Sequence, residues 1–375
     1  DQTQDAFTSF SGGTIKSATD TNRVGGTLQL SHEATLGSRL HRLSLGAEAA
    51  KGDVDVDSVT VAFGTTLAKR LSEETTWGIF AQEAIDLFPD LTLTAGLRYD
   101  VTRYDFEDLA TPANNAVKSY HRLTPRAGLA YSPWKPLTLY ANYGEGFRVP
   151  TTLELFAFPI FGSNPALRPM TSRTYEVGLR ARPWEWLEGT AAAFWTDARN
   201  EIVYDGSFAN INLPKSRRQG LEAGLRIRPH RMVELQATYT YTEAAFRTDA
   251  TLSSGAVEAG DRLPLVPLHR ATGSLTVRPL AGLELGISGQ YVGRQVLLND
   301  EPNQERYRLQ DTFTLGARVS FRWEQVTWWL QGQNLTNARH ESYGVMGGFP
   351  AAPNVMPAPG ISVLGGVTLT LENYY

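Results

Sequence analysis

Hydrophobic and polar residues alternate with a period of two along much of the chain. In one such run, Leu221, Ala223 and Leu225 take the apolar positions, and Glu222 and Arg226 take the polar ones. Comparable runs cover residues 91–100, 233–242 and 312–321. Because side chains on a β-strand alternate between its two faces, each run predicts a strand with one apolar and one polar face. The runs reach about ten residues, whereas strands of soluble proteins usually have about five or six.

The connections between these runs alternate between short and long. Tight turns are expected near Gly37, Pro89, Pro136, Trp184, His230, Ala281 and Glu324. Longer polar connections are expected at approximately 51–72, 106–119, 149–170, 246–265, 296–307 and 340–359. Aromatic residues gather near the short turns, namely Phe88, Trp134, Trp184, Trp186 and Trp323. An up-and-down barrel in an outer membrane has this asymmetry, with short periplasmic turns, long outer loops and aromatic belts at the boundaries.

The predicted fold is therefore all-β: an antiparallel up-and-down transmembrane β-barrel with about 16 strands in this chain. The first strand, near residues 5–11, has a weak pattern. The last, near 360–375, alternates clearly and ends on Tyr375, which resembles an outer-membrane assembly signal, although Asn373 departs from it. The tight turns also recur about every 48 residues, as in a β-propeller. Each repeat holds two long strands rather than four short ones, which favours the barrel.

Composition narrows the class of protein further. The chain has 375 residues, with 35 Lys and Arg against 39 Asp and Glu, and no Cys. A net charge of −4 excludes a general nucleic-acid binder, which needs a basic excess. The lack of Cys excludes disulfide scaffolds and thiolate zinc sites. No stretch approaches the roughly 18–20 apolar residues of a membrane helix, but alternating transmembrane strands of about 9–11 residues escape that criterion.

Several segments resemble the barrel domain of TonB-dependent outer-membrane receptors. They include Gly96-Leu-Arg-Tyr-Asp100, Pro125-Arg-Ala-Gly-Leu-Ala-Tyr131, Tyr143-Gly-Glu-Gly-Phe-Arg-Val-Pro150, Asn164-Pro-Ala-Leu-Arg-Pro169, Tyr175-Glu-Val-Gly178, Gln219-Gly-Leu-Glu222, Leu263-Pro-Leu-Val-Pro267, Asn334-Leu-Thr-Asn337 and Tyr343-Gly344. Each motif is weak alone, and their order and spacing over roughly residues 75–375 carry the resemblance.

The resemblance implies a 22-stranded barrel that encloses an N-terminal plug domain, preceded by a segment that engages an energy-transducing partner. No plug or partner segment is recognisable here, so residues 1–375 are expected to form one outer-membrane β-barrel domain without a plug. The chain is then either part of a 22-stranded barrel or a complete, reduced one. We favour the partial or split form, in which residues outside this chain complete the sheet, over a seam between its first and last strands.

The function that the resemblance implies is uptake of a scarce ligand, such as a siderophore or other metal chelate, across a bacterial outer membrane. The alternatives are a passive porin-like channel and a structural barrel subunit of a larger outer-membrane assembly. The expected partners are outer-membrane lipid, a separate plug or N-terminal barrel chain and other outer-membrane proteins. No cofactor and no nucleic acid are expected.

Two groups of residues are candidates for the functional site. Charged residues expected to face the lumen are Arg98, Arg126, Arg180, Arg226, Arg318 and Glu222. They either line a path for an anionic ligand or contact a plug, or they pair with neighbouring charges, as lumen residues of barrels often do. Residues expected in ligand-binding loops are Phe156, Phe158, Phe161, His340 and Tyr343. Exposed apolar loop residues can mark a binding site, but they can equally pack against neighbouring loops.

No catalytic or metal site is predicted. The six His residues are scattered, and no nucleophile-elbow motif is present. Asp53, Asp55 and Asp57 have a spacing that suits a hard cation, but no Gly turn and distal Glu follow them at loop spacing. A solvated acidic loop is therefore the expected structure there, and the protein is not expected to be an enzyme.

Overall fold

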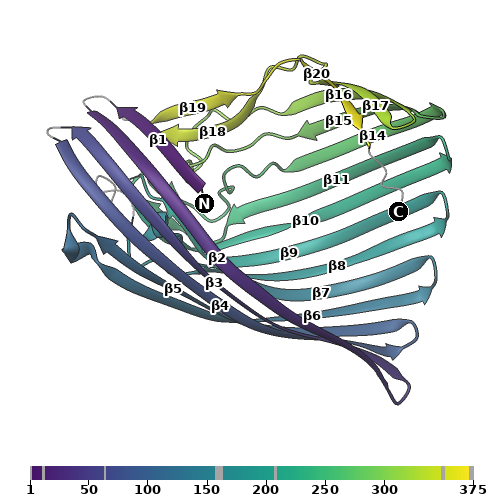
Figure 1. The fold of residues 1–375 in the computed structure, drawn as a ribbon, viewed down its shortest axis with the longest axis horizontal. Coiled ribbons are helices and arrows are strands. Elements are labelled where there is room, and N and C mark those ends of the chain that lie inside the picture. Colours follow the sequence, from purple (N-terminus) through teal and green to yellow (C-terminus); the bar gives the residue numbers. More distant parts are fainter. Residues whose placement is uncertain are drawn as a thin grey trace. The chain divides into compact units, whose positions relative to one another are not determined.

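The computed structural model describes residues 2–10, 13–62, 65–156, 164–206, 209–347 and 351–370, with side chains from residue 18 onward except within 58–68. Within this part of the chain, a 16-stranded sheet runs in chain order from β1 to β20 (Figure 1), which confirms the all-β up-and-down prediction. Its strands are β1 (Gln2–Phe10), β2 (Gly13–Leu36), β3 (Arg39–Ala62), β4 (Thr65–Phe88), β5 (Leu91–Asp108), β6 (Ala116–Trp134), β7 (Leu137–Arg148), β8 (Met170–Trp184), β9 (Leu187–Tyr204), β10 (Asn210–His230), β11 (Val233–Phe246), β14 (His269–Leu280), β15 (Leu283–Val292), β16 (Thr312–Trp323), β17 (Val326–Gln333) and β20 (Ser362–Leu369).

Smaller elements lie within the long connections. The hairpin of β12 (Ala250–Leu252) and β13 (Gly255–Val257) follows β11, and the hairpin of β18 (Glu341–Gly347) and β19 (Ala352–Pro357) follows β17. The short helices are η1 (Pro112–Asn114) and α1 (Thr152–Leu155). No helix in the described residues is long and apolar enough to cross a membrane.

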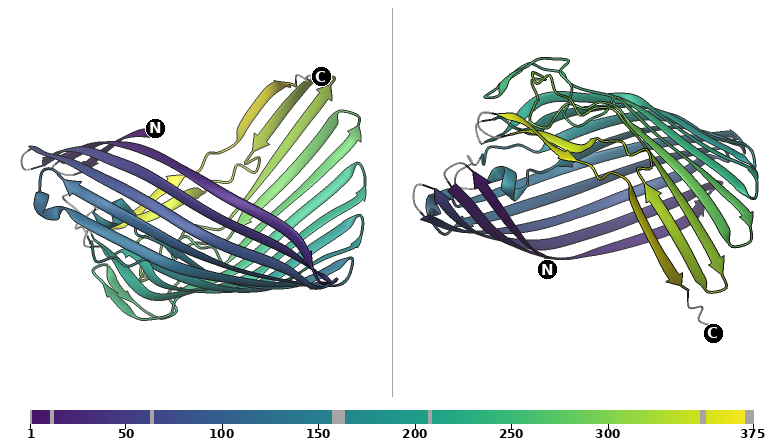
Figure 2. Two further views of the ribbon diagram at one scale, coloured as in Figure 1. Left: turned by 60° about the horizontal axis from the view of Figure 1, so that its bottom comes forward. Right: turned by 90° about the horizontal axis from the view of Figure 1, so that it is seen from above.

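Each predicted tight turn is a two-residue turn in the structure. They lie at residues 37–38, 89–90, 135–136, 185–186, 231–232, 281–282 and 324–325. At the β14–β15 turn, Gly282 has a φ of +82°, and a Cβ there would lie 2.1 Å from the carbonyl oxygen of Arg322. Only glycine suits such a left-handed, crowded position. Figure 2 shows the short turns of β8–β9, β10–β11, β14–β15 and β16–β17 at one common end of their strands.

By its contacts the chain divides into two compact units. Unit 1 comprises Asp1–Leu129, Tyr143–Arg173 and Ala198–Leu213, and unit 2 comprises Ala130–Asn142, Thr174–Asp197 and Pro214–Tyr375. The expectation that residues 1–375 form a single domain stays a prediction.

In unit 1, the predicted polar connection at 51–72 is wrong. Strands β3 and β4 have 24 residues each and run through this region, where Asp53 pairs with Glu73 in the antiparallel ladder. The alternation of the strand simply continues, because the acidic residues share one face while Val54 and Val56 take the other. Val56 is only 8% exposed and pairs with the buried Arg70 of β4, so the opposite face is a packed surface of the sheet rather than part of a loop.

The three aspartates expected in a solvated loop are consequently strand residues. Asp53, Asp55 and Asp57 are exposed on one face of β3. The ammonium group of Lys69 lies 3.9 Å from the carboxylate of Asp57. At about 3.3 Å per residue, a strand of 24 residues is roughly 80 Å long, whereas about 9–11 residues cross a membrane. These strands therefore extend well beyond a bilayer.

In unit 2, the two faces of the sheet differ as predicted. Leu221 and Leu225 of β10 are exposed on the apolar face, opposite Tyr241 and Ala237 of β11. On the other face, the Arg226 guanidinium lies 2.8 Å from the Glu234 carboxylate. A hollow of about 680 Å³ lies on the polar face of β11 and β14–β17, lined mainly by Thr, Ser, Gln and Gly with Arg318 and Glu284.

The aromatic residues near the short turns are exposed, as expected for a membrane boundary. Phe88, Trp134, Trp184, Trp186 and Trp323 all expose more than a third of their surface. In the described part of the chain, β1 and β20 are the edge strands of the sheet. How those edges are completed stays a prediction, and the aromatic end Tyr375 lies outside the described residues.

We expect Leu225→Arg to impair assembly more than Arg226→Leu. A cation on the lipid-facing surface near the bilayer midplane costs about 2–4 kcal/mol, whereas Arg226 lies on the polar face beside Glu234. Heat-modifiable mobility of the folded protein in gels and its amount in the outer membrane measure the effect. Greater damage from Arg226→Leu would contradict the assignment of the two faces.

Candidate functional site

The long connections of unit 2 pack against one another. We call the connections 247–268, 293–311 and 334–361, without the undescribed residues 348–350, the loop cluster. Its interior is apolar, with Leu263, Val296, Leu297 and Leu309 each no more than 6% exposed. Loops that bury such side chains lose the freedom of isolated surface loops, so the cluster is a defined surface.

The first and second connections are joined by one asparagine side chain and by a backbone hydrogen bond. The amide of Asn303 donates to the carbonyl of Arg262 at 2.9 Å and accepts from the Arg262 N–H at 3.1 Å. The N–H of Leu265 also donates to the carbonyl of Val296 at 2.9 Å. One asparagine side chain thereby substitutes for a pair of strand hydrogen bonds between two irregular segments.

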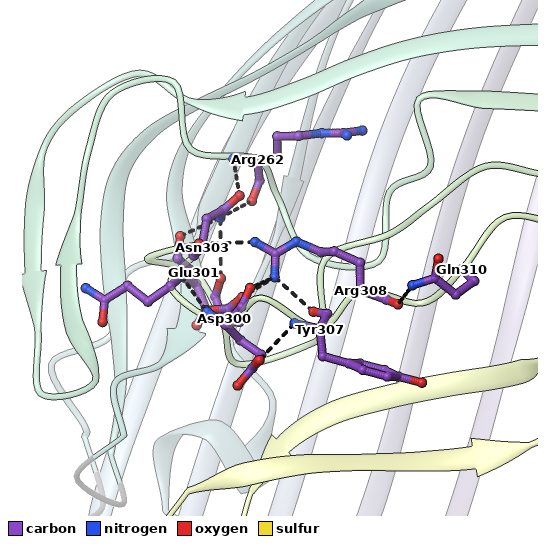
Figure 3. Close-up of polar contacts among 9 residues, drawn as sticks. Arg262, Asp300, Glu301, Asn303, Tyr307, Arg308 and Gln310 are labelled. Atoms are coloured by element: carbon purple, nitrogen blue, oxygen red, sulfur yellow. Dashed lines mark hydrogen bonds and ion pairs between the residues drawn. The ribbon is translucent and has the colours of Figure 1, made fainter.

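The second connection is closed internally by Asp300 and Arg308 (Figure 3). The carboxylate of Asp300 accepts from the N–H groups of Gln304 at 2.9 Å and Glu305 at 3.2 Å. The guanidinium of Arg308 donates to that carboxylate at 3.1 Å and to the carbonyl of Asn303 at 3.1 Å. Hydrogen bonds with charged partners are stronger than neutral ones, so this pair fixes the fold of residues 300–308.

The second and third connections meet at the β18–β19 hairpin. Leu298 donates its N–H to the carbonyl of Gly344 at 3.0 Å and accepts from the N–H of Met346 at 2.8 Å. The hydroxyl of Tyr307 donates to the carboxylate of Glu341 at 2.8 Å. A Cβ on Gly344 would lie 2.6 Å from a methyl carbon of Leu297, so only a glycine lets the hairpin come this close.

Glu301 is the most unusual residue of the cluster. Its side chain is 2% exposed, and its Oε2 has no hydrogen-bond partner among the described residues. Burial raises the pKa of Glu301 to about 7; a hydrogen bond from the backbone N–H of Glu301 itself opposes the rise, and the adjacent Asp300 carboxylate adds to it. Burial likewise raises the pKa of Asp300, although the N–H groups and Arg308 oppose it. Desolvation disfavours the charged form of a carboxyl group, and no Lys or Arg among the described residues is paired with Glu301 to compensate.

Two predicted ligand-loop residues lie in this cluster. His340 is half-buried, and its Nδ1 lies 3.1 Å from the carbonyl oxygen of Ala338. Tyr343 is half-buried in β18, paired with Met356 of β19, whose side chain is 60% exposed. The structure thus brings His340 and Tyr343 into one connection, next to an exposed apolar side chain.

The third predicted loop residue, Phe156, belongs to unit 1 and is buried. Its ring stacks on Phe106 with centroids 4.1 Å apart, and it is 4% exposed. It joins a core with Tyr104, Leu155 and Leu167 beneath α1. Phe156 therefore packs against neighbouring segments, one of the two roles that the sequence allowed. Phe158 and Phe161 lie outside the described residues.

The predicted lumen charges of unit 1 lie on the polar faces of β5 and β6. Arg98 pairs with Glu48 and donates to Asp100 at 2.8 Å. The side chain of Arg126 lies over Gly96, where a Cβ would be 2.8 Å from its Nε. The printed contacts of Arg98 are with neighbouring strands of the sheet, and the role of both arginines toward a ligand or plug stays a prediction.

The predicted lumen charges of unit 2 are spread over separate strands. Arg180 lies on β8, Arg226 and Glu222 on β10, and Arg318 on β16. Arg318 donates to Gln331 at 3.2 Å and lies 4.9 Å over the ring of Trp329. The structure does not gather them into one cluster, and their role toward a ligand or plug stays a prediction. Among the described residues, no group of three or more His, Asp or Glu side chains is placed to hold a metal ion.

Comparison with known proteins identifies the family. The family described as TonB dependent receptor-like, beta-barrel, matches residues 1–335. The chain belongs to the TonB-dependent receptors. This is a family of transporters and receptors rather than of enzymes, and it places the chain in the outer membrane of a Gram-negative bacterium.

Individual relatives are distant and longer. The chain is 27% identical over 235 residues to the ferrichrome outer membrane transporter/phage receptor of Escherichia coli K12, covering 60% of this chain and 29% of that protein. It is 26% identical over 272 residues to the ferrioxamine receptor of Yersinia enterocolitica, covering 72% of this chain and 35% of that protein. The chain thus spans about a third of the length of these relatives.

Solved structures show the same fold. The ferric citrate transporter FecA superposes with a TM-score of 0.80 at 16% identity, covering 97% of this chain and 57% of that one. The siderophore receptor PiuA of Acinetobacter baumannii gives a TM-score of 0.78 at 19% identity, covering 96% of this chain and 57% of that one. In a TonB-dependent receptor barrel, the long connections are the external loops, so the loop cluster lies on the outer side of the membrane.

Sequence reasoning missed the residues that organise this loop cluster. Asp300, Glu301 and Asn303 fall in the segment 296–307, which the sequence predicts only as a polar connection, and Arg308 follows it directly. Acidic and amide residues in such a segment are usually solvated. The one available signal is the apolar pair Leu297 and Leu309, which flank the segment and are both buried.

We expect Gly344→Val to loosen the loop cluster. The added side chain would collide with Leu297 and Leu309, which are buried and cannot move aside, and overpacking costs about 1–3 kcal/mol. Limited proteolysis within 293–311 and 334–361 measures the effect. Gly26→Ala is the control, because a Cβ there meets nothing within 4 Å. Unchanged proteolysis of Gly344→Val would contradict the packing of the hairpin.

We expect Phe156→Ala to destabilise the core under α1 in unit 1. Removing a buried Phe side chain costs about 3–5 kcal/mol, and Phe156 is stacked on Phe106. Leu153→Ala, in the same helix but 57% exposed, is the matched control. Thermal unfolding of both variants in detergent tests this, and equal losses of stability would show that Phe156 is not a core residue.

Proposed function

We propose that this chain is the wall and external-loop part of a receptor that takes up a siderophore or other metal chelate across the outer membrane. The supporting observation is the family match over residues 1–335, together with external loops that form a packed cluster in unit 2. The names of the relatives point the same way, because they include a ferrichrome transporter, a ferrioxamine receptor and a ferric-pyoverdine receptor.

In this proposal the loop cluster captures the ligand. Tyr343 and Met356 offer an aromatic and an apolar contact surface in the β18–β19 hairpin, and His340 lies at its start. A metal chelate is a compact molecule with an organic shell, and ligand sites commonly combine such aromatic and apolar contacts with a few polar groups. The hollow on the polar face of β11 and β14–β17, rich in hydroxyl and amide groups, would then be part of the path.

Energised transport needs components that we place outside this chain. We propose a plug domain and an energy-transducing partner of the TonB type, because the relatives are about three times longer than the part that this chain matches. The charges on the polar faces, such as Arg318 and Glu222, are the contacts that we propose for the plug.

We expect cells that carry the intact protein as their only such receptor to take up one class of ferric chelate saturably. Ferrichrome, ferrioxamine and pyoverdine loaded with radioactive iron are suitable probes, and a protonophore should abolish uptake. Uptake that rises linearly with concentration and ignores the protonophore would indicate a passive channel. A lack of uptake with stable co-purifying proteins would indicate a structural barrel.

We expect Tyr343→Ala to weaken chelate binding about tenfold, equivalent to about 1.4 kcal/mol of binding free energy. The control is Leu364→Ala, which removes an exposed side chain on β20 away from the loop cluster. Direct binding to purified intact receptor measures both variants. Equal affinity of the two would place the ligand outside the hairpin.

A further inference from the structure

We propose that Glu301 is a proton-linked positioning residue of the loop cluster: its uncharged form keeps the connection 293–311 docked between its two neighbours, and its ionised form loosens that docking. The inference deepens the proposed function, because the docked connection supports the hairpin that carries Tyr343. Nothing in the family match assigns a role to this residue.

The adjacent carboxyl groups of Asp300 and Glu301 differ in their partners. Asp300 has a guanidinium partner and two backbone N–H donors, so its charge is compensated where it lies. Glu301 is almost fully buried, with one oxygen unpartnered among the described residues. A buried carboxyl group that has no cationic partner is tolerated when neutral, and its ionised form favours any arrangement that lets water in.

The charged groups of the connection 293–311 do not compensate an ionised Glu301. The charge that acts on it most directly is Asp300, which opposes its ionisation. From its own connection, Arg308 is engaged by Asp300 and by backbone carbonyls, and the Glu305 carboxylate accepts from the N–H of Tyr307.

The neighbouring connections supply no compensating cation either. From 247–268, the Arg262 guanidinium donates to the carbonyl of Val266 at 3.5 Å. From 334–361, Glu341 is a further acid and accepts from Tyr307. Within the described residues, therefore, no lysine or arginine is paired with Glu301.

Glu301 is linked to the β18–β19 hairpin through the backbone of its own connection. The amide of Asn303 donates to the carbonyl of Glu301 at 2.9 Å, and the same amide bonds Arg262 of the first connection. Three residues before Glu301, Leu298 carries the backbone bonds to Gly344 and Met346 of β18. A displacement of residue 301 thus acts on the attachments to both neighbouring connections.

The direction of the pH dependence follows by linkage. The pKa of Glu301 is about 7 in the docked structure, against 4.5 for a solvated glutamate. The docked form therefore binds an extra proton between these values. Docking is strongest below pH 4.5, weakens as pH rises toward 7 and is constant above it. The docking equilibrium is expected to change by on the order of 100-fold across this interval.

The test is hydrogen exchange of the intact receptor in outer-membrane vesicles without ligand, between pH 5.5 and 8.0, corrected for the intrinsic pH dependence of exchange. We expect protection of 293–311 and of β18 to fall by tenfold or more over this range, while protection of β14–β17 stays constant. Glu301→Gln should stay protected at both pH values, because its side chain carries no charge at either. Glu258→Gln, at an exposed acid of the first connection, should behave as wild type.

A pH dependence that persists in Glu301→Gln, or wild-type protection that is constant with pH, would overturn the inference. If Glu301→Gln does not assemble, the wild-type profile decides: a transition confined to the loop cluster supports the inference, and its absence refutes it. Because no chelate is present, failure here leaves the uptake assay untouched. Failure of uptake with an intact pH transition would refute the proposed function alone.

Discussion

Backbone hydrogen bonding in lipid is the constraint on which the rest of this structure depends. Hydrocarbon offers no partner to an N–H or C=O group, so every strand that crosses it needs neighbours on both sides. Between its edge strands β1 and β20, the sheet meets this demand with hairpins in chain order, joined at one end by two-residue turns. Amphipathic alternation then follows, because one face of each strand meets lipid and the other meets the polar interior.

Outside the bilayer the constraint changes, and the long connections solve a different problem. In unit 2 they bury apolar side chains together with irregular backbone, whose polar groups then need partners. Asn303 and Arg308 provide them by bonding carbonyl and N–H groups of two connections. The cost of the arrangement is concentrated at Glu301, whose carboxyl group is buried with no cation paired to it in the part of the chain that the structure describes. A site that is stable in one protonation state and strained in the other is suited to regulation.

Sequence reasoning succeeded where one local rule decides the structure. The tight turns near Gly37, Pro89 and Ala281 were placed correctly, because glycine, proline and a break in alternation mark them. It was wrong at 51–72, where acidic residues suggested a loop although Val54 and Val56 continue the strand period. For Phe156 it left burial and binding open, since only the tertiary structure shows the stacked Phe106. Glu301 gave no sequence signal, because a polar residue in a predicted connection is expected to be solvated and only the tertiary structure shows it 2% exposed.

The most direct test of the account is cysteine scanning along β10, which the absence of Cys from this chain simplifies. Single cysteines at positions 220 to 226 of the intact protein in its membrane would be labelled with a small charged thiol reagent and with a lipid-soluble one. The account predicts a period of two, with Leu221, Ala223 and Leu225 positions reacting from lipid and Glu222, Gly224 and Arg226 positions reacting from water. Labelling without this alternation would contradict the membrane-spanning sheet.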